Sequence, residues 1–139
     1  MGDREVVTPE APAPGGSYSQ GVIAGDFIFT AGFGPGDPGT GEVRGSTVYE
    51  QTRFALENVA AVLASAGASL GDVVKVTSHL SDLADFEEYD RAFASAFSKP
   101  FPARTTVGSR LAGILVEIDV VARVPNPCAH GGSSGRRTA

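Results

Sequence analysis

Residues 114–124 (ILVEIDVVARV), near the C-terminal end of the chain, indicate the fold most directly. Side chains of a β-strand point alternately to its two faces, so this segment predicts a strand with two unlike faces. One face is apolar and carries Val116, Ile118, Val120, Ala122 and Val124. The opposite face is mixed and carries Leu115, Glu117, Asp119, Val121 and Arg123. The apolar face needs a cover of helices, and the mixed face must meet water or another subunit.

A long helix predicted over residues 47–66 supplies part of that cover. Thr47 and Glu50 have the spacing of a capping box, in which the hydroxyl and the carboxylate each accept a hydrogen bond from a free backbone N–H group. Apolar and small side chains recur three and four positions apart on one face, at Thr52, Leu56, Val59, Leu63 and Ala66. Gly67 is a natural end for this helix.

A second helix is predicted after Asp85, which is in position to cap it. Its aromatic residues form one stripe, made of Phe86, Tyr89, Phe93 and Phe97. At this spacing the stripe favours core packing over a ligand-binding aromatic box. Residues 72–80 read as a strand, and residues 21–24 and 27–30 read as a hairpin with a two-residue turn. The sequence therefore predicts a mixed α and β fold with both helices on one face of the sheet.

The composition limits the domain count and the classes of function. A chain of 139 residues fits one domain, and a net charge of −5 argues against a broad nucleic-acid surface. One cysteine and two histidines are too few for an internal disulfide or a convincing metal cluster. No apolar run has the ~18 residues of a membrane span, and no signal peptide is recognisable, so the expected compartment is cytoplasmic.

Both ends of the chain are expected to be loose, and the segment EAPAPGG at residues 10–16 cannot form the interior of a helix. Cys128 and His130 fall in a stretch with little to bury, so neither is expected to take part in chemistry. The expected division is an N-terminal segment with a short first strand (1–16), a single domain (17–124) and a flexible tail (125–139).

Two charged residues are the first candidates for chemistry. Glu117 lies in the middle of the predicted strand, where its carboxylate is either solvated or held in a cleft between subunits. Arg104 follows a proline-restricted segment, so its guanidinium suits bidentate capture of a carboxylate, with a structural ion pair as the alternative. Tyr18, at the mouth of the hairpin, has a hydroxyl that can donate to a ligand. His79 is expected to be an ordinary strand residue.

Several segments, taken in order, carry a family resemblance. They include residues 13–22 (APGGSYSQGV), 29–35 (FTAGFGP), 72–75 (DVVK), 101–104 (FPAR) and 116–122 (VEIDVVA). Together they resemble the Rid family of reactive intermediate deaminases, also called YjgF or L-PSP. The resemblance runs from about Val6 to Arg123, and its strength lies in the order and spacing of the segments.

The resemblance implies an α+β fold like that of a trimeric chorismate mutase, with a cleft between each pair of neighbouring subunits in a homotrimer. It implies that Arg104 holds the substrate carboxylate, that Glu117 activates water and that Tyr18 closes the cleft. The implied reaction is hydrolysis of a 2-imino acid, or its enamine tautomer, to a 2-oxo acid and ammonia, without a cofactor or metal. The expected partners are a small carboxylate substrate and other copies of the chain, with no nucleic acid and no membrane.

Four positions depart from the family pattern, and all four are expected to contact the substrate. Ala31 replaces a Ser and Phe33 replaces a Gln, so the pocket should be less polar and favour an imine with a larger apolar side chain. Asp90 replaces a frequent Asn, and Thr106 replaces a Cys. Two alternatives stay open: a pathway-specific relative that performs ring deamination, dehydration or tautomerisation, and a non-catalytic protein that binds a metabolite.

Overall fold

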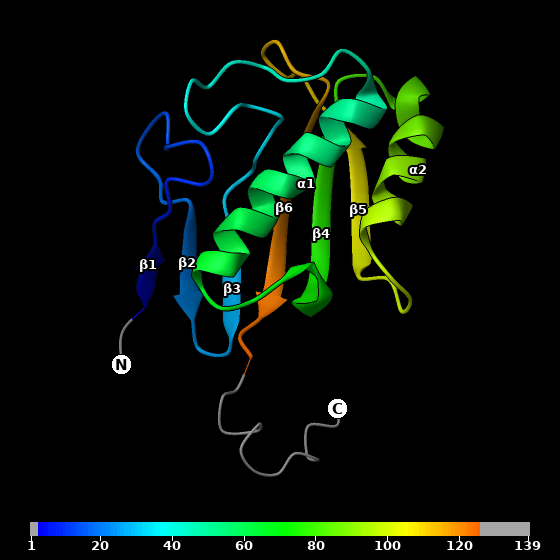
Figure 1. Cartoon of the computed structure of the whole chain (residues 1–139). Helices are drawn as coiled ribbons and strands as arrows, with labels where there is room; N and C mark the ends of the chain where they lie inside the picture. Colours follow the sequence, from blue (N-terminus) through cyan, green and yellow to red (C-terminus); the bar gives the residue numbers. More distant parts are fainter. Residues whose placement is uncertain (1–2, 126–139) are drawn as a thin grey trace.

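The computed structural model describes residues 3–125, which form a mixed sheet with two helices packed on one face (Figure 1). The strands are β1 (Arg4–Val6), β2 (Gly21–Ala24), β3 (Phe27–Thr30), β4 (Val73–Leu80), β5 (Ala103–Gly108) and β6 (Val116–Arg123). The helices are α1 (Val48–Ser65) and α2 (Phe86–Ala96), with short 3₁₀ turns η1 (Leu70–Asp72) and η2 (Leu83–Asp85). The predicted α+β fold is confirmed. Cys128 and His130 lie outside the described residues, as does the expected tail beyond residue 125.

β6, the strand that the alternating segment 114–124 predicts, lies inside the sheet, whose order is β1-β2-β3-β6-β4-β5. It pairs antiparallel with both β3 and β4. β4 and β5 run parallel because α2 carries the chain back between them, as a parallel pair requires. The predicted hairpin is formed by β2 and β3, and Gly25 in its turn has a φ of 62°, which suits glycine. Within residues 3–125, β5 is an edge strand with its outer side unpaired.

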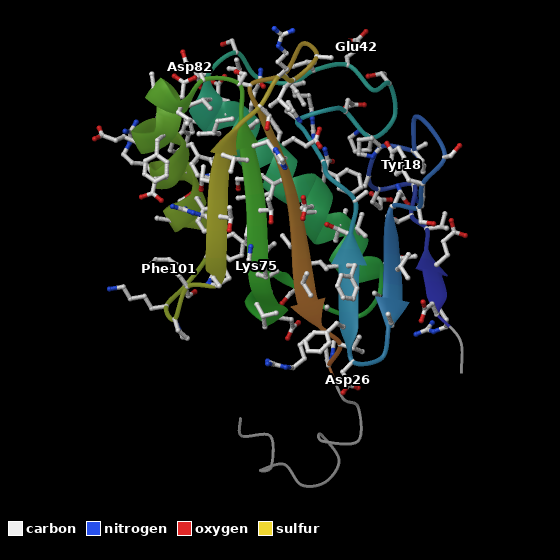
Figure 2. All side chains as sticks on the ribbon, turned by 180° about the vertical axis from the view of Figure 1, so that it is seen from behind. Tyr18, Asp26, Glu42, Lys75, Asp82 and Phe101 are labelled. Atoms are coloured by element: carbon white, nitrogen blue, oxygen red, sulfur yellow. The ribbon has the colours of Figure 1, made fainter. Side chains whose placement is uncertain are left out.

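The two faces of β6 differ as the sequence predicts. Its apolar residues are each at most 1% exposed and belong to the core that α1 packs against: Val116, Ile118, Val120 and Ala122. Glu117, Asp119 and Val121 alternate with them and are only partly buried. Figure 2 shows the opposite side of the sheet, where no described helix covers the strands and Lys75 is labelled. We call this side the open face.

The predicted helix over 47–66 is α1, and its capping box is confirmed. The Glu50 backbone N–H donates to Thr47 Oγ1 at 3.1 Å, and the Thr47 N–H donates to Glu50 Oε1 at 3.4 Å. Gly67 follows the helix with a φ of 83°. The buried side of α1 packs on the sheet through Ala55, Leu56, Val59, Val62 and Leu63. Within the described residues, neither α1 nor α2 combines the length and the apolar composition of a membrane-spanning helix.

Asp85 takes the N-cap position of α2, so the predicted start of the second helix is confirmed. The predicted side-chain cap is wrong, because Asp85 makes no side-chain hydrogen bond to the helix. Instead, Asp82 caps the preceding turn η2, where its Oδ1 accepts from the Ala84 N–H at 2.9 Å. The turn already supplies a carbonyl for the Phe86 N–H, so the helix continues from it without a new side-chain cap. The aromatic stripe packs in the core as expected, with Phe86 at its exposed end.

The expectation of a loose segment at residues 10–16 is wrong for its beginning, because a buried glutamine holds Ala11 and Pro12. Gln20 is 2% exposed and its Oε1 accepts from the Thr8 N–H at 2.7 Å. Its Nε2 donates to the carbonyls of Thr8, Ala11 and Pro12 at 2.9–3.2 Å. One amide side chain therefore replaces the regular pairing that the Pro-rich segment lacks.

Candidate functional site

The two charged candidates lie on opposite faces of the sheet. Arg104 on β5 stands opposite Val76 of β4, which is fully buried beneath the helices. Glu117 on β6 stands opposite His79 of β4, which alternates with the buried residues and points to the open face. Paired residues of neighbouring strands project to the same side. One copy of the chain therefore does not bring the guanidinium and the Glu117 carboxylate together.

The guanidinium of Arg104 is held by a carboxylate and by aromatic rings. Its Nη1 donates to Asp90 Oδ1 at 2.8 Å. Its Cζ lies 4.7 Å from the centre of the Phe93 ring, 5.2 Å from Tyr89 and 5.4 Å from Phe86, all on α2. Such cation–π contacts attract the charge to the rings and fix the plane of the group. Within one chain, the ion pair that the sequence left as an alternative is present.

Thr106 lies on the same strand and side as Arg104, opposite Ser78 of β4. The Tyr89 hydroxyl donates to Ser78 Oγ at 2.5 Å, within the buried layer. Burial raises the pKa of Tyr89, while its hydrogen bonds to Ser78 and Thr106 and the positive charge of Arg104 act in the opposite direction. Three predicted site residues, Asp90, Arg104 and Thr106, are therefore brought together beside the edge of the sheet.

On the open face, the carboxylate of Glu117 packs directly against Gly32. A Cβ atom built on Gly32 would overlap Glu117 Oε2 and lie 3.0 Å from its Cδ. Only glycine leaves room for this side chain. Ala31, the neighbouring predicted site residue, is partly buried and packs at the margin of the core, with its N–H donating to the Gln20 carbonyl. Ala31 is thus the chain neighbour of Gly32, which Glu117 contacts, but its own side chain packs against the core.

Other polar residues of β4 and β6 lie on the same face of the sheet as Glu117. His79 stands across from it, and His79 Nδ1 is 2.7 Å from Ser109 Oγ. Burial raises the pKa of Asp119 above its usual value, and the nearby charges of His79 and Lys75 oppose that shift. Among residues 3–125, no group of three or more His, Cys, Asp or Glu side chains could hold a metal ion.

Phe33 does not occupy the position expected of it. Its side chain is 5% exposed and belongs to the hydrophobic core, where its backbone forms a two-bond bridge with Ile118. Because Ile118 faces the helices, Phe33 is a core residue and does not make an open pocket less polar. Tyr18 is 53% exposed, and its hydroxyl accepts a hydrogen bond from the Gly15 N–H at 3.0 Å. It stands at the surface beyond β2 (Figure 2).

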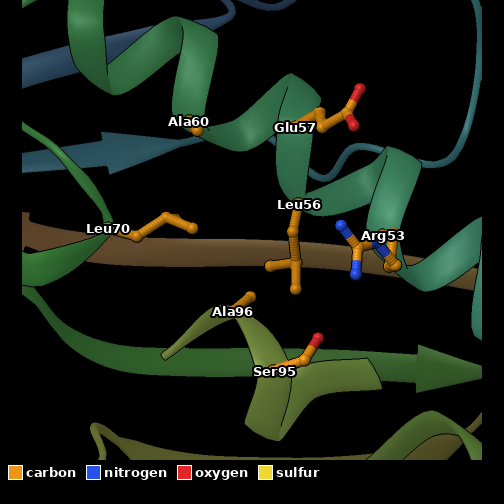
Figure 3. A pocket seen from close by; sticks show the side chains of 7 residues that line it. All are labelled: Arg53, Leu56, Glu57, Ala60, Leu70, Ser95 and Ala96. Carbon is orange, nitrogen blue, oxygen red and sulfur yellow. The ribbon is translucent and has the colours of Figure 1, made fainter. Parts of the chain in front are cut away.

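Two pockets among residues 3–125 lie away from the candidate residues. One pocket of about 140 Å³ lies between α1 and α2, where Leu56 and Ala96 face it and Arg53 and Glu57 border it (Figure 3). A second, of about 370 Å³, lies near the loop that joins α2 to β5 and includes Phe101. Neither is lined by Arg104 or Glu117. The candidate groups therefore lie on surfaces, not in these cavities of one chain.

Sequence reasoning missed two features of this region. The role of Gly32 depends on a contact with Glu117, 85 positions later in the chain, and no local pattern signals it. The buried Asn58 on α1 is the other: its Nδ2 donates to the carbonyls of Gly34 and Gly36, both at 2.9 Å. This amide fixes the loop that follows Gly32. A lone Asn on the apolar side of a predicted helix is the signal that could have revealed it.

The fold places this chain among small α+β proteins in which two helices cover one face of a mixed sheet. Its candidate site has a carboxylate on the open face and a guanidinium on the edge strand. The chain belongs to one family of that class, described as endoribonuclease L-PSP, whose model matches residues 8–124. The family indicated by the sequence resemblance is thereby confirmed.

Individual relatives agree with this assignment. A RutC family protein of Pyrococcus abyssi is 44% identical over 124 residues, which cover 88% of this chain and 98% of the relative. The 2-iminobutanoate/2-iminopropanoate deaminase of Escherichia coli is 39% identical over 124 residues, covering 86% and 96%. The crystal structure of RidA from an Antarctic Psychrobacter superposes with a TM-score of 0.82 and 35% identity, covering 87% and 99%. The relatives thus include imine deaminases.

Proposed function

We propose that this chain is a hydrolytic deaminase of 2-imino acids and their enamine tautomers, producing a 2-oxo acid and ammonia. The observation that carries the proposal is its 39% identity, over 86% of the chain, with the Escherichia coli 2-iminobutanoate/2-iminopropanoate deaminase. The presence of Arg104 and Glu117, each held in a defined environment, supports it. Since Phe33 is a core residue, only Ala31 still argues for a more apolar substrate, so we propose no preference for bulky side chains.

The active assembly is a homotrimer in which each site combines two copies of the chain. Arg104 and Glu117 lie on opposite faces of one sheet, so a shared cleft requires Arg104 from one copy and Glu117 from the next. The unpaired edge of β5 can approach the open face of a neighbour. That face carries exposed aromatic side chains, Phe27 and Phe29, at 38% and 46% exposure, which suit burial between copies.

The chemistry follows from these two groups. Arg104 binds the substrate carboxylate and fixes the adjacent imine carbon, which removes much of the entropic cost of the reaction. Glu117 of the neighbouring copy takes a proton from water as the water oxygen bonds to the carbon of the protonated imine, and the π electron pair of the C=N bond moves to nitrogen. Glu117 then returns this proton to the nitrogen. The remaining C–N bond breaks and its electron pair leaves with ammonia, while the hydroxyl proton passes to Glu117 as the C=O bond of the 2-oxo acid forms.

The experiment generates 2-iminopropionate with an amino-acid oxidase and follows the 2-oxo acid produced. The wild type should form the 2-oxo acid faster than buffer alone. Arg104→Ala and Glu117→Gln should each lower this rate at least ~100-fold. Equal rates for wild type and buffer would refute the deaminase. If the protein still bound a small carboxylate, that result would favour the metabolite-binding alternative. Light scattering tests the oligomer, and a monomer would remove the shared cleft.

Mixing the two inactive variants tests the two-copy site directly. In trimers assembled from equal amounts of both, about a quarter of the clefts combine an intact Arg104 from one copy with an intact Glu117 from its neighbour. Co-refolding should therefore restore roughly a quarter of the wild-type rate. A site built within one copy would show no recovery, because each chain lacks one of the two groups. Each variant refolded alone is the matched control.

A further inference from the structure

The ion pair between Arg104 and Asp90 leaves most of the guanidinium available. A guanidinium has five N–H donors, and Arg104 uses one of them on Asp90. Among residues 3–125, the side chain of Arg104 makes no other hydrogen bond, and its Cζ lies within 5.4 Å of the centres of three aromatic rings of α2. The two side chains retain 21% and 48% exposure. A ligand can therefore reach Arg104 while Asp90 stays beside it.

Asp90 changes what those free donors can hold. A bare carboxylate that docks on Arg104 comes close to the negative charge of Asp90, and the two anions repel each other. A ligand with an N–H group beside its carboxylate can donate that hydrogen to Asp90. The ligand carboxylate then accepts hydrogen bonds from Arg104 while the ligand N–H donates to Asp90, and both contacts are charge-assisted hydrogen bonds.

We propose that Asp90 is a specificity-determining residue, which makes the Arg104 site favour carboxylates with a neighbouring N–H group over 2-oxo acids. The favoured class comprises 2-imino and 2-amino acids. The inference rests on the proposed function, because it takes Arg104 as the carboxylate-binding group. In the proposed reaction the substrate carries the N–H group and the product carries C=O in its place. Asp90 thus favours binding of substrate and departure of product.

The test compares two probes of nearly equal shape, 2-aminobutyrate and 2-oxobutyrate, by calorimetric titration of the intact protein. Asp90→Asn is nearly isosteric and keeps an oxygen that can accept from Arg104, so the fold should be retained. Removing one charge near a bound anion should tighten 2-oxobutyrate about 3- to 10-fold. Binding of 2-aminobutyrate should tighten less or weaken. Glu87→Gln, on the exposed first turn of the same helix, is the control and should move both by less than about 2-fold.

The informative quantity is the ratio of the two dissociation constants. The inference is supported if the preference for 2-aminobutyrate over 2-oxobutyrate, measured by this ratio, decreases in Asp90→Asn but not in Glu87→Gln. Equal changes for both probes would overturn it, because a purely structural role would affect them alike. Failure of wild type to bind either probe would also overturn it. An absence of imine hydrolysis with the ratio shift intact would refute the proposed function and leave this inference standing.

Discussion

Replacing Gly32 with alanine tests whether that position exists to make room for Glu117. The added methyl group would overlap Glu117 Oε2 and lie 3.0 Å from Cδ and 3.1 Å from Cγ, so the carboxylate must turn away. Overpacking typically costs about 1–3 kcal/mol. We expect the lower half, about 1–2 kcal/mol, because Glu117 is only partly buried and its end can rotate toward the open face.

A double-mutant cycle isolates that contact. The free energy of unfolding is measured with urea at one fixed protein concentration. Gly32→Ala should lower it in the wild type. The loss should be at least ~1 kcal/mol smaller in a Glu117→Ala background, because the carboxylate no longer fills the space. Gly71→Ala is the matched control. Its Cβ would meet only Ser69 Oγ, at 3.5 Å, which is an ordinary contact, so the background at position 117 should not matter.

The same variant has a predicted effect on activity. A displacement of about 1 Å at a catalytic group can cost on the order of 100-fold in rate, so kcat for imine hydrolysis should fall by about that factor. KM should change little, because Arg104 lies on the other face of the chain. An equal cost of Gly32→Ala in both backgrounds would refute the reasoning, since the methyl group would then act through something other than Glu117.

Three further substitutions probe the scaffold. Thr47→Ala should lower the free energy of unfolding by about 1 kcal/mol in urea, because it removes the capping hydroxyl. Tyr89→Phe should cost about 1–3 kcal/mol by leaving Ser78 unpaired, and less in a Ser78→Ala background. The raised pKa of Asp119 means that its stabilising contribution is present below its usual value of 3.8 and is lost as pH rises through the folded value. Asp119→Asn should therefore melt higher than wild type at neutral pH, with the gap closing in acid; a gap independent of pH would contradict this.

Local rules explain why much of the fold could be predicted. The two-residue period of β6 and the spacing of Thr47 and Glu50 each depend on neighbours within a few positions, and both features are present. The predicted cap at Asp85 failed because a preceding turn, capped by Asp82, already supplies the helix start. The N-terminal segment is held by Gln20 across 8 to 12 positions, a distance at which composition gives no signal.

The site was harder to predict because its geometry depends on strand register. The sequence indicates that Glu117 and Arg104 are candidates for chemistry. Only the pairing of β4 with both β5 and β6 shows that their side chains lie on opposite faces of the sheet. Phe33 illustrates the same limit. A family departure suggested a pocket residue, whereas its bridge to Ile118 turns the ring into the core.

The two charged groups, Arg104 and Glu117, are held in place by different parts of the fold. Arg104 is supported by α2, through Asp90 and the aromatic rings, whereas Glu117 is supported by Gly32 on the open face. Each half is thus fixed by its own side of the sheet, so neither needs the other to hold its shape. In the proposed trimer, assembly alone joins the halves. Activity per chain should therefore fall on dilution in parallel with the fraction of chains in trimers. The melting temperature of helix α2 should depend less on protein concentration than the activity does.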